Sequence, residues 1–272
     1  MQDPTISLIL RSWSWQPLIL IGLGSVAAGY AYAFYYFRQH GWLERLVQRG
    51  LVKRRHPWFF AAGLAALFVA LLSPIDVLSD LLFMMHMIQH LLLVMVAPPL
   101  LLLGLPSPFL RWLILESKLR RVLGGLTYPL AAYPLYNATL LAWHIPALYE
   151  AALRNGIIHD LQHALFFYTA IFFWWRVIDP TGGWYPLWHW PPAKWVYLLI
   201  AAPPSYVLGA IFWGSSSVWY PFYTEQPRLW GLSPLQDQRY AGMLMWLHGW
   251  MYLMASMLVF FLWYDPEKEE RL

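Results

Sequence analysis

The chain has 272 residues, of which 60% are hydrophobic, 18% aromatic and only 12% charged. Soluble domains carry about 25% charged residues, so this composition indicates a membrane protein. The net charge of +4 comes from basic residues in short stretches between apolar segments, and it gives no reason to expect a nucleic-acid partner. The chain has no cysteine, which excludes disulfides, thiolate metal sites and cysteine nucleophiles.

Seven apolar segments approach the roughly 20 residues that a helix needs to cross a bilayer. They lie at 17–37, 57–75, 81–103, 125–144, 157–178, 194–213 and 240–263. The fourth is the weakest because it contains Pro129, Pro134 and Asn137. Proline pairs in the third and sixth segments predict bends in those helices. We therefore predict an all-α polytopic membrane protein, a single seven-helix transmembrane domain over residues 1–272.

Basic residues predict the orientation of these seven segments. Fourteen of the 18 Lys and Arg residues fall at one face: Arg38, Arg45, Arg49, Lys53, Arg54, Arg55, Arg111, Lys118, Arg120, Arg121, Arg176, Lys194, Lys268 and Arg271. The remainder, Arg11, Arg154, Arg228 and Arg239, fall at the other face. Cytoplasmic loops are enriched in Lys and Arg, so we predict the N-terminus outside and the C-terminus in the cytoplasm. Two aromatic-rich stretches, 184–190 and 213–230, are typical of the membrane interface.

Histidine is the residue type that points to chemistry. Six of the nine histidines fall in the outer half of the predicted bilayer: His86, His90, His144, His159, His163 and His248. Four of them form two i,i+4 pairs, and each such pair shares one helix face. Polar rings are costly in lipid and usually face the interior of a bundle, where they often mark function. We predict that the six rings meet around one cavity that opens toward the outside.

Methionine and aspartate extend this candidate metal site. Apart from Met1, every methionine lies in the third or seventh segment. Met87 is near His90, while Met245, His248 and Met251 are spaced by three. Imidazole with thioether suits Cu(I), whereas imidazole alone also suits Cu(II), zinc and iron. The candidate metal ligands are His86, His90, His144, His159, His163, His248, Asp76, Met87, Met245 and Met251.

Structural roles for these residues remain open at this point. Methionine is a flexible filler of apolar interiors, so its enrichment also fits packing. Asp76 fits a helix start or the water boundary, and it also fits a partner that orients a histidine ring. A buried histidine can simply link helices through hydrogen bonds.

Several motifs resemble one known family. They are Ser73-Pro74-Ile75-Asp76, His86-Met87-x-Gln89-His90, Ala97-Pro98-Pro99-Leu100, Trp143-His144-x-Pro146, His159-x-x-x-His163 and Phe172-Phe173-Trp174-Trp175. Together they resemble the CtaG family of assembly factors for caa-type cytochrome c oxidases, over about residues 17–263. The resemblance implies a multi-pass protein of the bacterial plasma membrane that helps a haem-copper oxidase to mature, with copper as its cargo. Implied partners are cytochrome c oxidase subunits and an extracytoplasmic copper chaperone. Ile75 stands where the family pattern leads us to expect Leu.

Three functions remain compatible with these residues. The first is a copper-handling assembly factor, and the second is a redox protein with haem held by two histidines such as His90 and His163. The third is a metal-free scaffold for oxidase subunits; a membrane di-iron oxygenase is a weaker option. The sequence has no Ser-His-Asp arrangement, phosphate-binding glycine loop or paired buried carboxylates, so we do not expect an enzyme.

Overall fold

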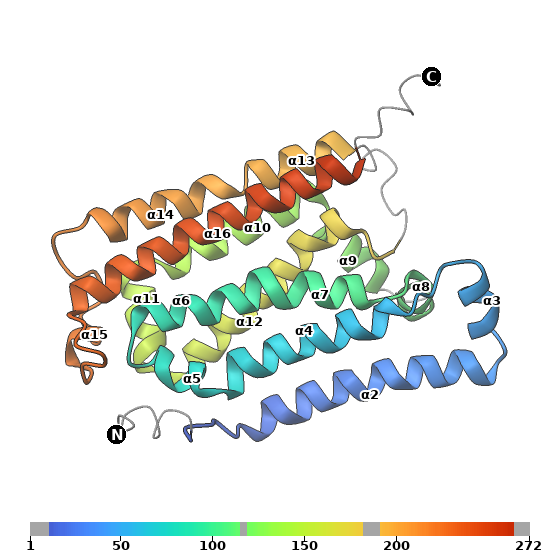
Figure 1. Cartoon of the computed structure of the whole chain (residues 1–272), viewed down its shortest axis with the longest axis horizontal. Coiled ribbons are helices and arrows are strands. Elements are labelled where there is room, and N and C mark those ends of the chain that lie inside the picture. The colour runs from blue at the N-terminus through green and yellow to red at the C-terminus, as the bar shows by residue number, and fades with distance from the viewer. Residues whose placement is uncertain (1–10, 115–118, 182–190, 264–272) are drawn as a thin grey trace.

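The computed structural model describes residues 11–114, 119–181 and 191–263, and all regular structure within them is helical (Figure 1). The all-α prediction is confirmed. The helices are α2 (Pro17–Gln39), α3 (Leu43–Gln48), α4 (Arg55–Leu72), α5 (Pro74–Ser79), α6 (Phe83–Leu91), the π-helix η1 (Leu92–Val96), α7 (Ala97–Gly104), α8 (Ser107–Ile114), α9 (Leu119–Leu126), α10 (Pro129–Trp143), α11 (Pro146–Arg154), α12 (Gly156–Ile178), α13 (Pro191–Leu199), α14 (Ala202–Gly214), α15 (Phe222–Glu225) and α16 (Pro234–Trp263).

Five helices of the described chain are long and apolar enough to cross a membrane: Pro17–Gln39, Arg55–Leu72, Phe83–Gly104, Pro192–Gly214 and Pro234–Phe261. The predicted segments at 125–144 and 157–178 are also helical, as α10 and α12, but neither meets the same standard. The α10 helix has 15 residues, and α12 has 23 residues that include several polar ones. A membrane protein with several spanning helices is therefore supported, while seven spans stay a prediction.

Proline sets where three of these helices begin or break. The helix predicted to start at residue 125 starts instead at Pro129, because the residue before a proline avoids the helical conformation and Tyr128 is extended. The sixth segment breaks between α13 and α14, just before Pro203-Pro204. In the third segment Pro98 has no N–H for the carbonyl of Val94, and the indole of Trp174 donates to that carbonyl at 2.9 Å. This bond ties the third segment to α12.

Close glycine contacts hold two helix pairs together. A Cβ on Gly104 of α7 would lie 2.5 Å from the backbone nitrogen of Phe60 in α4. In the same way, a Cβ on Gly242 of α16 would lie 2.9 Å from the carbonyl oxygen of Gly209 in α14. Small residues let helix backbones approach closely, which is how helices commonly pack in membranes. The histidine-bearing helices α6 and α12 lie between these pairs, and α16, which carries His248, belongs to the second pair (Figure 1).

The two ends of the bundle differ in the elements that they carry. The short helices α5, α11 and α15 lie at one end, and α3, α8 and α9 lie at the other (Figure 1). Arg45, Arg111 and Arg120, which were predicted to share a face, belong to α3, α8 and α9 respectively. The segments 184–190 and 264–272 and Lys118, on which part of the orientation argument depends, lie outside the described residues.

Candidate metal centre

The start of α6 is fixed by a carboxylate from another helix. Leu82 precedes α6 in an extended conformation and supplies no side-chain cap. The carboxylate of Asp237 in α16 accepts hydrogen bonds from the backbone N–H groups of Phe83 at 2.8 Å and Met84 at 2.9 Å. It thereby satisfies two donors that every helix start leaves open, and its negative charge favours that end of the helix dipole. Asp237 was not among the site residues predicted from the sequence. An acidic residue near the start of a membrane-spanning helix often has a functional or structural partner, and this could have identified it.

A local cap positions the second histidine pair. Asn155 precedes α12, and its side-chain oxygen accepts from Ile157 N–H at 3.0 Å and Ile158 N–H at 3.3 Å. Asparagine is a preferred residue at this position because its side chain satisfies open N–H groups. The cap places His159 in the first turn of α12 and His163 one turn later on the same face.

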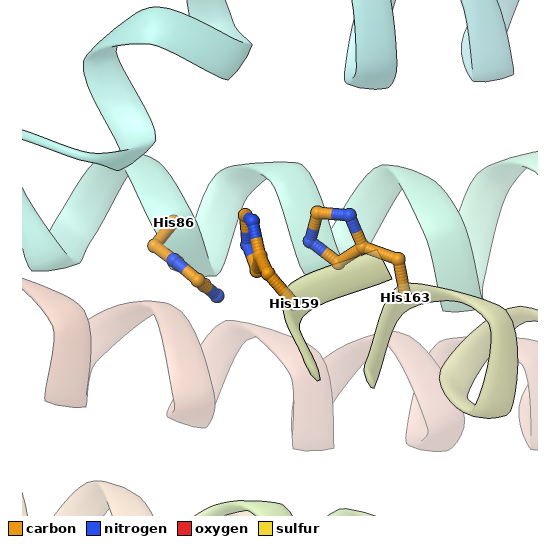
Figure 2. Close-up of side chains that lie close together, drawn as sticks. All are labelled: His86, His159 and His163. Atoms are coloured by element: carbon orange, nitrogen blue, oxygen red, sulfur yellow. The ribbon is translucent and has the colours of Figure 1, made fainter. Parts of the chain in front are cut away.

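Three histidines from α6 and α12 converge (Figure 2). One ring nitrogen each from His86, His159 and His163 lies within 4.8 Å of the other two. A tetrahedral ion with metal–nitrogen bonds of about 2.0 Å would hold such nitrogens roughly 3.3 Å apart, so the three nitrogens would move closer together on binding one ion. The predicted convergence of the two His-x-x-x-His pairs is therefore present in the structure for these three residues.

His90 extends this group, and we call His86, His90, His159 and His163 the histidine cluster. Its ring centroid lies 4.3 Å from that of His86 and 5.4 Å from that of His163. Among the described residues, no partner with good hydrogen-bond geometry reaches the ring nitrogens of His86, although the Ser79 backbone lies close to that ring. The Nε2 atoms of His90, His159 and His163 likewise have no partner there. Buried polar atoms are nearly always paired, so this concentration of unpaired nitrogens suits an ion or water as the missing partner.

His90 also faces a second space, which we call the central cavity. Its volume is about 10 Å³, close to the smallest that holds one water molecule. The lining residues are Met87, His90, Leu91, Val94, Leu140, His144, Phe166, Leu244, Met245 and His248. Two of the predicted methionines thus meet three of the predicted histidines. Met251 is not among the lining residues and packs partly buried against the apolar core.

His144 presents a free nitrogen near this cavity. Its Nδ1 lies 2.6 Å from the carbonyl oxygen of Leu140, and because a carbonyl only accepts, Nδ1 must carry the proton. The lone pair of a neutral ring then lies on Nε2, for which no described residue supplies a partner. A backbone carbonyl on the opposite nitrogen is the usual way to orient a metal-binding histidine.

His248 differs from the other five. Its Nδ1 lies 3.0 Å from the hydroxyl of Ser205, and its Nε2 lies 3.2 Å from the hydroxyl of Tyr136. Tyr252 in turn donates to Tyr136 at 2.7 Å. All four side chains are buried, and we call them the His248 network. The His248 ring lines the central cavity with both of its nitrogens already engaged.

The carboxylate of Asp76 accepts two hydrogen bonds and lies close enough to His159 to attract it. Its carboxylate accepts from Ser14 Oγ at 2.7 Å and from Gln89 Nε2 at 2.8 Å. The Gln89 amide also donates to the carbonyl of Ala70 at 2.9 Å. Burial raises the pKa of Asp76 above its ordinary value, and the hydrogen bonds and the attraction to His159 offset part of this effect. The arrangement fits a residue that fixes Gln89, and with it the face of α6 next to His90.

Comparisons with known proteins agree with this picture. The model of the cytochrome c oxidase caa3 assembly factor family, Caa3_CtaG, matches residues 28–265. Uncharacterised proteins of Mycobacterium bovis and Mycobacterium tuberculosis are each 27% identical over 268 residues. The alignments cover 90% of this chain but only 38% of each relative, so the chain spans well under half of their length. No solved structure matches the chain.

Proposed function

Because the chain belongs to the cytochrome c oxidase caa3 assembly factor family, we propose that it binds copper among its histidines and passes it to an oxidase under assembly. The copper is cargo in this proposal. The family gives the general partner, a cytochrome c oxidase, while the metal and its ligands are inferred from this chain's own residues.

The observation that carries the proposal is the set of unpaired imidazole nitrogens. Five histidines contribute them, on α6, on α12 and directly after α10, and in the histidine cluster the His86 ring lies within 6.0 Å, centroid to centroid, of the other three. Neutral imidazole beside the thioethers of Met87 and Met245, with no cysteine in the chain, is a ligand set that suits Cu(I). Imidazole binds a metal only when it is neutral, so acid should release the copper.

The proposed setting is the bacterial plasma membrane, with seven helices, the N-terminus outside and the C-terminus in the cytoplasm. Five apolar helices support the membrane, and the basic helices α3, α8 and α9 at one end support the orientation. The histidine cluster sits near the opposite end, so copper would arrive from outside, delivered by an extracytoplasmic copper chaperone. The recipient would be a cytochrome c oxidase subunit in the same bilayer.

The space around the histidines favours an ion over haem. Sites for organic cofactors and drug-sized ligands have volumes of roughly 300 Å³ or more. The central cavity measures about 10 Å³. A haem held between His90 and His163 would need a slot for the porphyrin ring, whereas the 5.4 Å between their ring centroids leaves room for a single ion.

The test is metal analysis of the purified chain after loading with Cu(I), together with its absorption spectrum. We expect bound copper and no haem absorption band. Replacement of two cluster residues, His86→Leu with His163→Leu, should lower the copper content at least ~10-fold, since both substitutions remove ligands. His40→Asn, at an exposed histidine, is the matched control and should retain full copper. Full copper content in the double variant would overturn the assignment, and a haem spectrum would replace it.

A further inference from the structure

A groove lies beside the central cavity, between α6 and α16. Its volume is about 510 Å³, and its lining residues are Met84, Ile88, Leu232, Tyr240, Met243, Leu244 and Leu247. Leu244 also lines the central cavity. One leucine side chain is thus shared by the walls of the groove and of the histidine-lined space.

Methionines lie on both sides of this shared wall. Met84 and Met243 line the groove, and Met87 and Met245 line the central cavity. Each space therefore receives one thioether from α6 and one from α16. Exposure falls from 45% at Met243 to 2% at Met87 and 4% at Met245, so the methionines that line the groove are nearer the surface than those that line the central cavity.

We propose that this groove is a lateral port for Cu(I), with Met84 and Met243 as transient thioether ligands and Leu244 as the gate to the histidines. The inference rests on the proposed copper-binding function and adds the route that the ion follows. Thioethers are soft, neutral ligands that suit Cu(I) and not hydrated hard cations.

Passage along the port requires only ligand exchange. A copper–sulfur bond to Met84 or Met243 breaks as one to Met87 or Met245 forms, and copper–nitrogen bonds to His90 or His144 follow. Copper stays in the +1 state throughout, so no electron donor or acceptor is needed. Thioethers carry no ionisable proton, so the first exchange is independent of pH. The path runs from an apolar flank of the bundle to its interior, which suits exchange with a partner in the bilayer.

The experiment measures how fast the purified full chain takes Cu(I) from a coloured Cu(I) chelator, with stopped-flow absorbance as the readout. Met84→Leu combined with Met243→Leu removes both sulfur atoms while keeping apolar bulk. Met254→Leu combined with Met257→Leu is the matched control, since both residues are exposed on α16 and neither lines the groove. We expect loading to slow at least ~10-fold in the first variant only, with the final copper content unchanged.

Leu244→Ala tests the gate with an effect of opposite sign. A smaller side chain widens the passage, so loading should become faster, and misfolding does not readily produce such a gain. If the wild type loads copper and the Met84/Met243 variant loads it equally fast, the port is refuted while the histidine site stands. If the wild type takes up no copper at all, the proposed function and the port fail together.

Discussion

The histidine cluster and the His248 network both place histidine inside the bundle, but they differ in whether the ring nitrogens have hydrogen-bond partners; His86, His90, His163 and His248 are buried, and His159 is partly buried. Both nitrogens of His248 have side-chain partners, and the chain of hydroxyls continues to Tyr252. The cluster leaves both nitrogens of His86 and one each of His90, His159 and His163 without a partner of good hydrogen-bond geometry among the described residues. A buried histidine that links helices is therefore available in this fold, as His248 demonstrates. The cluster histidines lack such hydrogen-bond partners, and we therefore assign a bound ligand to them.

The largest expected effect comes from a cluster variant that breaks the site and spares the fold. His163→Leu should weaken Cu(I) binding at least ~100-fold, or about 2.7 kcal/mol, because a direct ligand is lost. Its thermal midpoint should stay the same or rise, since the substitution removes a buried polar atom that lacks a partner. Competition with a Cu(I) chelator measures the first quantity and thermal unfolding in detergent the second. A large loss of stability with unchanged copper affinity would place His163 in the structural class with His248.

The converse variant lies in the His248 network. Tyr136→Phe deletes the hydroxyl between His248 and Tyr252, leaving two buried groups without that partner. The cost should be about 1–3 kcal/mol of unfolding free energy, with little change in copper affinity. Tyr168→Phe, at an exposed tyrosine of α12, is the matched control for thermal unfolding. If Tyr136→Phe instead abolished copper binding without lowering stability, the contrast between the two regions would collapse.

The pairing of the cluster histidines was predictable from sequence, because it depends on local spacing, whereas the different state of His248 was not: the sequence grouped it with the other five as a metal ligand. Helix periodicity put His86 with His90 and His159 with His163, and apolar length gave helices at all seven predicted positions. The partners of His248 were not predictable, since Ser205 and Tyr136 are distant in sequence and meet it only through packing of α14 and α10 on α16. The same holds for the cap that Asp237 supplies to α6.

Some features were predictable only in part. The proline pairs indicated where helices bend, but not that Trp174 would satisfy the carbonyl that Pro98 leaves open. The place of Asp76 at the outer end of the second segment made it a candidate, but its hydrogen bonds to Ser14 and Gln89 join residues far apart in the sequence and were not predictable. Which residues share one helix face can be predicted from sequence, whereas a role that depends on contact with a second helix cannot.

A smaller effect should follow from loosening the support of the cluster. Asp76→Asn removes the charge that anchors Gln89 and attracts His159. Residues that orient metal ligands typically contribute 10–100-fold in affinity, and we expect about 10-fold weaker Cu(I) binding. Asp160→Asn is the matched control, because Asp160 also adjoins His159 but is exposed, so solvent screens its charge. Equal losses in the two variants would mean that general negative charge matters and that the Asp76–Gln89 bond does not.

The smallest expected effect is a pH dependence of stability, which tests whether burial or hydrogen bonding has the larger influence on the pKa of Asp76. Burial raises the pKa of this carboxyl above its ordinary value of about 3.9. Between the ordinary and the raised pKa, the folded chain binds more protons at Asp76 than the unfolded chain does. This contribution to the free energy of unfolding is therefore present at low pH and is lost as pH rises through the raised pKa. Asparagine does not titrate, so the Asp76→Asn variant lacks this contribution. Because the wild type loses it as pH rises, the thermal midpoint of the variant relative to wild type should increase from pH 4 toward neutral pH. A relative midpoint that decreases over this range would mean that the hydrogen bonds from Ser14 and Gln89 outweigh burial and that the ionised carboxylate stabilises the fold.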